Sequence, residues 1–113
     1  MQISTRQSGN ATIVDLAGDV DLYNAGAVRQ ALLGAVREDR AARVLVNMSQ
    51  VRYVDSSGVA TLVEALKAAR DLGRRFILFG VSGAAREVLE LSRLIKIFEV
   101  YENEEQALRS PPD

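Results

Sequence analysis

Apolar and polar positions follow two periodicities along this chain, one typical of strands and one typical of helices. Residues 1–7 and 11–16 are short β-prone runs, and Ser8-Gly9-Asn10 between them favours a turn at low steric cost. We therefore expect a hairpin. Residues 44–48 and 76–79 are short apolar runs of the kind found in strands covered on both faces. The first of these two strands should lie centrally in the sheet.

Apolar residues recur every three or four positions in two longer segments, which predicts amphipathic helices. One segment covers residues 25–36. The other begins at Ser56, and Gly73 ends it in the usual C-terminal role of glycine. After Gly80, Ser82 and Gly83 a third helix is expected through residue 91, and residues 97–101 should close the sheet. Asn103, with Gln106 three residues later, predicts the capped start of a last helix.

This order of elements predicts an α/β fold with a mixed sheet of about five strands and about four helices. The sheet should begin with the N-terminal hairpin and continue by right-handed parallel crossovers, because helices separate the later strands. A chain of 113 residues has the usual size of one domain. We assign residues 1–109 to that domain and expect the tail, residues 110–113, to be frayed.

Composition narrows the functions that are open to such a domain. Hydrophobic residues make up 48% of the chain and the net charge is -1, as in an ordinary globular protein. There is no cysteine and no histidine, which removes Ser-His-Asp and Cys-His nucleophile systems and most zinc sites. The arginines are interrupted by carboxylates, so no basic stripe points to nucleic acid. No signal pattern or membrane-length apolar run is present, and we expect a cytoplasmic protein without a membrane partner.

Two polar segments are expected to meet at one edge of the sheet. In sheets of this kind, ligands and partners meet the loops at the carboxyl ends of the parallel strands. One segment runs from Asp19 through Asp21 to Asn24, and the other runs from Ser49 to Gly58. We expect both to be loops and both to lie at the same edge.

The string Asp55-Ser56-Ser57-Gly58 allows two interpretations. It is first of all a helix start, since Asp and Ser side chains accept hydrogen bonds from the first backbone amides of a helix. Two adjacent hydroxyls and a glycine also suit a modification site. Gly58 should leave the first turn open for a second protein, and a phosphate on Ser56 would lie near the positive end of the helix.

The string VRYVDSSGVATLVEALKAAR resembles the signature of STAS domains in bacterial anti-sigma factor antagonists, where an Asp-Ser-Ser/Thr-Gly motif opens the second helix. GDVD resembles the Gly-x-x-Asp segment of that family, and ELSRLIKIFEVYENEEQAL resembles its C-terminal strand and helix. The resemblance covers essentially the whole chain. It implies that Ser56 is the regulatory phosphorylation site. It also implies a partner-binding face, to which we assign Asp19, Asp21, Asn24, Ser49, Asp55, Ser56, Ser57 and Gly58.

The resemblance further implies a ligand and substrate rather than an enzyme, with no cofactor. Such antagonists bind an anti-sigma factor with an ATP-binding serine kinase fold and so release the sigma factor. The kinase phosphorylates the serine, the complex separates, and a serine phosphatase resets it.

Two alternatives remain open. Asp19, Asp21 and Asp55 could together hold Mg²⁺, although aspartate also suits turns and caps, and we favour that simpler interpretation. STAS domains also act as subunits of lipid-transport ATPase complexes and in signalling scaffolds. The intact Asp55-Ser56-Ser57-Gly58 motif favours the phosphorylation switch over these roles.

Overall fold

The computed structural model describes residues 1–38 and 41–111, and within them it contains one mixed five-stranded sheet. The strand order is β1-β2-β3-β4-β5, so spatial order follows chain order. β1 and β2 pair antiparallel, and every later pairing is parallel. The strands are β1 (Gln2–Ser8), β2 (Ala11–Val20), β3 (Arg43–Val54), β4 (Arg75–Phe79) and β5 (Glu99–Tyr101). The predicted hairpin, parallel crossovers and α/β class are confirmed.

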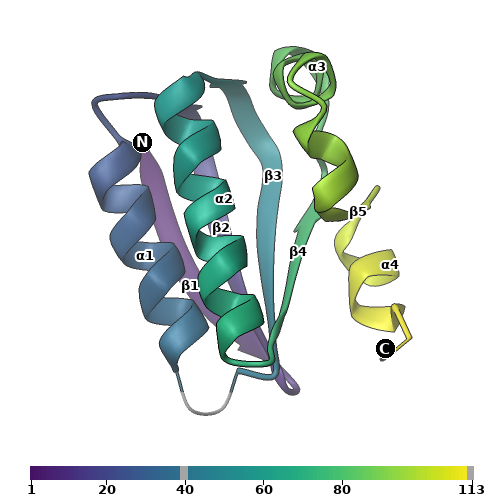
Figure 1. Ribbon diagram of the computed structural model, residues 1–113. Helices are drawn as coiled ribbons and strands as arrows, with labels where there is room; N and C mark the ends of the chain where they lie inside the picture. Colours follow the sequence, from purple (N-terminus) through teal and green to yellow (C-terminus); the bar gives the residue numbers. More distant parts are fainter. Residues whose placement is uncertain (39–40, 112–113) are drawn as a thin grey trace.

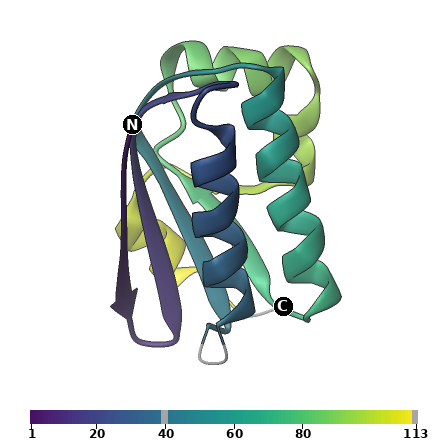
Figure 2. The same cartoon turned by 90° about the vertical axis from the view of Figure 1, so that its left-hand side faces the viewer.

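Helices cover both faces of this sheet (Figures 1 and 2). α1 and α2 lie side by side on one face, and α4 lies on the other. The helices of the described residues are α1 (Ala25–Arg37), α2 (Ser56–Asp71), α3 (Gly83–Leu91) and α4 (Glu104–Arg109), with a short 3₁₀ helix η1 (Leu94–Ile97). Among these described helices, none is long and apolar enough to cross a membrane.

Strand side chains alternate between two separate apolar clusters, as the pleat of a sheet requires. Val14, Val46 and Leu78 face the larger cluster, which they share with residues of α1, α2 and α3. Ile13, Leu45 and Ile77 face the smaller cluster, which Ala107 of α4 completes. Burial on both faces explains why these strands appear in the sequence as continuous apolar runs.

Strands β2 and β3 are longer than the sequence predicted. β3 continues through Ser49 to Val54, and β2 continues through Asp19 to Val20, so these positions lie in strands and not in loops. The pairing shifts register between Asp15 and Ala17 and again between Gly18 and Asp19. Each shift leaves one extra residue in β3, and pairing then resumes as far as Val20 and Val54.

The C-terminal elements differ from the prediction in detail. Ile97 belongs to η1, and β5 begins only at Glu99. The Gln106 backbone N–H donates to Asn103 Oδ1 over 2.9 Å, which confirms the capped start of α4. The Gln106 side chain accepts from the backbone N–H of Glu102, one residue before the cap.

The frayed tail expected at residues 110–113 falls partly outside the described residues, because Pro112 and Asp113 are not described. Ser110 is buried, and its hydroxyl donates to the carbonyl of Ala107 over 2.7 Å. Ser110 is therefore packed against the domain, and the expectation that the tail frays from residue 110 is wrong at this position.

Candidate functional site

The carboxyl ends of β2 and β3 lie next to each other and lead into α1 and α2. Val20 is paired with Val54 at the last position of the ladder, and the Asp55 backbone N–H donates to the Val20 carbonyl over 3.2 Å. We call the turn 21–24 and the helix start 55–58 the loop edge. Its existence confirms that these two segments meet at one edge of the sheet, as the sequence predicted.

Asp55 joins the two halves of the loop edge with one carboxylate. Oδ1 accepts from the Gly58 backbone N–H over 3.0 Å, which caps α2. Oδ2 accepts from the Leu22 backbone N–H over 3.0 Å, which fixes the turn before α1. The cap interpretation of Asp55 is confirmed, and the second bond is one that no local pattern predicts.

The turn before α1 is held by its own polar side chains. Asp21 Oδ1 accepts from the backbone N–H groups of both Tyr23 and Asn24, each over 3.1 Å, in the manner of an Asx turn. The Asn24 side-chain amide donates to the Asp19 carbonyl over 2.9 Å. The Asp19 carboxylate lies 3.7 Å from Arg52 Nε on the neighbouring strand.

Ser56 is the first residue of α2 and its side chain is exposed. Within the described parts of the chain, its hydroxyl has no hydrogen-bond partner. Ser57 is half-buried, and its carbonyl accepts from the Thr61 hydroxyl over 3.0 Å. Of the two adjacent serines, Ser56 therefore presents the more accessible hydroxyl.

The expectation that Gly58 clears a path to Ser56 is wrong, because Gly58 is buried and faces the sheet. A Cβ atom there would lie 2.2 Å from the Val20 carbonyl oxygen and 2.9 Å from Cγ1 of both Val20 and Val54. Glycine is needed at this position so that α2 can start in contact with the strand ends. Its side of the helix is not available to a second protein.

A shallow apolar groove of about 530 Å³ begins at Ser56. It runs along α2 past Val63 to Lys67 and is bounded on its other side by Leu94 of η1. A candidate hydroxyl at the end of an open apolar surface suits contact with a macromolecule, because drug-sized ligands are usually enclosed by their pockets.

Comparison with known proteins decides the family. The family model for the STAS domain matches residues 2–107. The chain belongs to the STAS domain family.

Relatives place this STAS domain with the anti-sigma factor antagonists. It is 31% identical to the anti-sigma-B factor antagonist of Listeria monocytogenes over 101 residues, which are 88% of this chain and 86% of that protein. Two solved structures show the same fold. One is an anti-sigma factor antagonist from Mycobacterium paratuberculosis, with a TM-score of 0.83, 24% identity and coverage of 95% of this chain and 90% of that one. The other is the Bacillus cell fate determinant SpoIIAA in its phosphorylated form, with a TM-score of 0.71, 20% identity and coverage of 95% and 96%.

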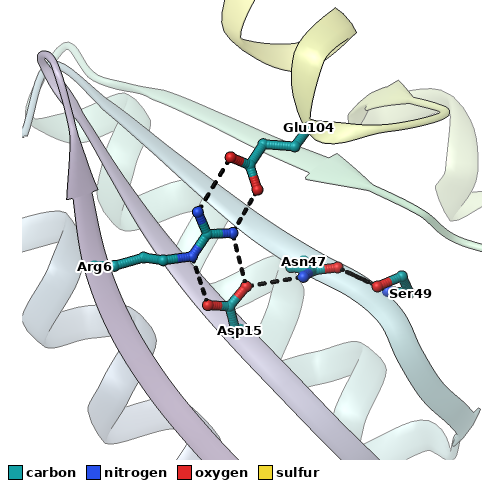
Figure 3. Close-up of polar contacts among 5 residues, drawn as sticks. All are labelled: Arg6, Asp15, Asn47, Ser49 and Glu104. Carbon is teal, nitrogen blue, oxygen red and sulfur yellow. Dashed lines mark hydrogen bonds and ion pairs between the residues drawn. The ribbon is translucent and has the colours of Figure 1, made fainter.

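Ser49 does not join the other predicted site residues of this STAS domain. Its hydroxyl donates to Asn47 Oδ1 over 2.6 Å, and Asn47 Nδ2 donates to Asp15 Oδ1 over 2.8 Å. Asp15 accepts in turn from Arg6, which also binds Glu104 of α4 (Figure 3). These five residues, which we call the Arg6 network, lie across β1, β2 and β3 and reach α4.

The Arg6 network has a defined electrostatic effect. The hydrogen bonds from the Arg6 guanidinium hold the pKa of Asp15 and the pKa of Glu104 below the usual range of a carboxyl group. Sequence reasoning missed this network. The contact between Arg6 and Asp15 could have been predicted, because the hairpin register places these opposite charges close together on paired strands. The contact between Arg6 and Glu104 could not, because the two residues are 98 positions apart and no local pattern links them.

Sequence reasoning also missed the exposed apolar residues of the loop edge. Leu22 and Tyr23 extend from the turn into solvent. An apolar pair inside an otherwise polar turn was the available signal.

The acidic residues of the loop edge have structural partners. Asp55 caps α2, Asp21 closes its turn, and Asp19 faces Arg52. Across residues 1–38 and 41–111, the structure groups no three carboxylates in a way that could hold a metal ion. Turn and cap roles account for Asp21 and Asp55, and the ion pair with Arg52 accounts for Asp19.

Proposed function

We propose that this STAS domain binds an anti-sigma factor with an ATP-binding serine kinase fold and that phosphorylation of Ser56 ends the binding. One observation carries this proposal. The exposed Ser56 hydroxyl lies at the start of α2, beside a turn that Asp55 fixes to the same helix start. The names of its relatives and the phosphorylated form of SpoIIAA support the same assignment.

The modification is a simple group transfer. The Ser56 oxygen forms a bond to the γ-phosphorus of ATP, the bond from that phosphorus to the ADP oxygen breaks, and the hydroxyl proton passes to a basic group of the kinase. The product carries about 1.5 to 2 additional negative charges beside Asp55. It also lies next to the β-phosphate of the ADP that has just formed.

The helix and the interface respond differently to this charge. A phosphate at the start of α2 gains typically about 0.3 to 1 kcal/mol from the helix dipole, so the fold tolerates it. A closed interface would have to remove water from the phosphate, at a cost of several kcal/mol. The fold therefore persists while the complex separates. A serine phosphatase returns the protein to its binding form, and the cycle belongs in the cytoplasm, where ATP and the sigma factor are found.

Site-resolved mass spectrometry tests the site of modification. Wild type, Ser56→Ala and Ser57→Ala are incubated with ATP and a candidate anti-sigma factor serine kinase from the same organism. We expect one phosphate on Ser56 in wild type and in Ser57→Ala, and none in Ser56→Ala. A phosphate elsewhere, or none, would favour a lipid-transport ATPase subunit or a signalling scaffold instead.

Affinity measurements test the consequence for binding. We expect Ser56→Asp to weaken binding to the kinase while changing the free energy of unfolding by no more than about 0.5 kcal/mol, as for other exposed positions. Leu72→Asp, which places a charge at the opposite end of α2, serves as the matched control and should bind like wild type. Equal affinities for wild type and Ser56→Asp would contradict the switch.

A further inference from the structure

Two apolar side chains of the loop edge are exposed to water although their backbone is fixed. Tyr23 is 93% exposed and Leu22 is 69% exposed. Both belong to the turn that leads from β2 into α1, on the same edge as Ser56. Single exposed apolar residues are common on protein surfaces, so exposure alone does not mark a binding site.

The distinguishing feature is how firmly the turn is held. The Leu22 backbone N–H donates to Asp55 Oδ2 over 3.0 Å, and the Tyr23 N–H donates to Asp21 Oδ1 over 3.1 Å. The side chain of Asn24 closes the turn against the Asp19 carbonyl. A side chain that is presented from a fixed backbone loses little entropy when it is buried by a partner, and a tyrosine offers a large contact area with few rotatable bonds.

The charges around this pair indicate the chemistry of its partner. The carboxylates of Asp21 and Asp55 accept from the turn's backbone N–H groups and, within the described residues, have no cationic partner, whereas Asp19 is paired with Arg52. Interfaces bury aromatic anchors at their centre and match opposite charges around them. A complementary surface therefore has an apolar pocket with basic groups at its rim.

We propose that Leu22 and Tyr23 are the anchor by which the partner kinase recognises this protein, inserting into an apolar, basic-rimmed pocket of that kinase. This inference rests on the proposed function. Asp55 links the anchor to the phosphorylation site, because its carboxylate fixes the backbone of the anchor and the next residue, Ser56, receives the phosphate. The kinase can then hold the turn and place its ATP at the start of α2 in one bound orientation.

Isothermal titration calorimetry with the kinase that phosphorylates Ser56 tests the inference on unphosphorylated protein. We expect Tyr23→Ala to bind at least about tenfold more weakly than wild type, because truncated aromatic anchors usually cost more than about 1.4 kcal/mol. Leu22→Ala should lose roughly fivefold, as a smaller anchor beside the first. Tyr23→Phe, which keeps the ring, should bind within about twofold of wild type, since the ring supplies most of the contact area.

Leu72→Ala is the matched control. Leu72 is 50% exposed and lies at the opposite end of α2 from Ser56, so its loss removes apolar surface away from the loop edge. It should leave affinity unchanged. Thermal unfolding of each variant checks that the fold is intact, and Tyr23→Gln gives a second, polar replacement if Tyr23→Ala is less stable.

The outcomes separate the inference from the proposed function. If Ser56→Asp weakens binding but Tyr23→Ala and Leu22→Ala bind like wild type, the anchor is overturned and the switch stands. If Leu72→Ala weakens binding as much as Tyr23→Ala, the loss is not specific to the loop edge and the anchor is overturned as well. If wild type does not bind the kinase, the proposed function fails and the anchor fails with it.

Discussion

The loop edge and the Arg6 network contain similar polar residues, but these residues form different kinds of hydrogen bond in the two regions. At the loop edge, the carboxylates of Asp21 and Asp55 accept from backbone N–H groups, so they fix the chain and leave the Ser56 hydroxyl in water. In the Arg6 network, side chains bind one another from Ser49 to Glu104. The first cluster fixes a turn and leaves neighbouring side chains exposed, whereas the second ties strands and a helix of the fold together.

The largest effect is expected where the loop edge packs against the sheet. Gly58→Ala would place a Cβ atom 2.2 Å from the Val20 carbonyl oxygen, so α2 or β2 must move. We expect a loss of about 1 to 3 kcal/mol or more in the free energy of unfolding, measured by urea denaturation.

Gly26→Ala is the matched control for this change. Gly26 lies in α1, and a Cβ there meets nothing within 4 Å, so alanine should stabilise the helix by about 0.5 to 1 kcal/mol. Equal effects of the two substitutions would show that Gly58 is not held against the strand ends.

A smaller loss is expected for Asp55→Ser. Serine can still cap α2, but one hydroxyl cannot also accept from the Leu22 N–H, so the tie between the two halves of the loop edge is lost. We expect a cost of about 1 kcal/mol. Asn103→Ser at the cap of α4 is the control, because the Asn103 side chain accepts from the Gln106 N–H and, within the described residues, bridges to no second segment. The bridging role of Asp55 would be refuted by equal losses in the two variants.

The Arg6 network should lose its contribution in acid. Arg6 holds the pKa of Asp15 and of Glu104 below their usual range, so its stabilisation is complete above the carboxyl pKa values of the unfolded chain. It is lost as pH falls below about 4, through the lower values of the folded state. The melting temperatures of wild type and Arg6→Gln should therefore differ near about pH 7 and converge near about pH 2.5.

The expected size of this effect is below about 1 kcal/mol, because these ion pairs are partly exposed. Arg29→Gln, which removes an exposed pair with Glu64, is the comparison variant. A difference in melting temperature that stays constant across the pH range would mean that the carboxylates do not carry the effect of Arg6.

The smallest effect is expected for Ser49→Ala. Ser49 belongs to the Arg6 network, and we now expect it to take no part in kinase binding. Affinity should match wild type, and the free energy of unfolding should change by no more than about 0.5 kcal/mol. A clear loss of affinity would mean that Ser49 belongs to the binding face and that the two regions are not separate in function.

Sequence reasoning succeeded where one local pattern determines the structure. Apolar periodicity predicted α2, and parallel connection through helices was enough to bring Asp21 and Asp55 to one edge. It failed where a residue's surroundings come from elsewhere in the chain. The sequence pattern around Gly58 predicts an open helix start, because the atom that Gly58 approaches, the Val20 carbonyl oxygen, is far away in sequence.

The polar residues that follow the apolar run of β3 predict a loop at Ser49, and this prediction is wrong. The strand continues because a shift in register keeps β3 paired with β2. The double use of the Asp55 carboxylate and the bond from Arg6 to Glu104 depend on tertiary placement in the same way. Candidate residues could be named from the sequence, but their division into two regions could not.

The agreement between strand order and chain order has a consequence for synthesis of the protein. Each strand pairs with the one made before it, so a chain emerging from the ribosome can pair β1, β2 and β3 while its last third is still being translated. The contact from Arg6 to Glu104 joins two residues 98 positions apart, and it can form only when translation has passed residue 104. Truncated chains released before that point would lack this closing contact and the α4 cover over the smaller apolar cluster, which gives quality-control proteases exposed apolar surface to recognise.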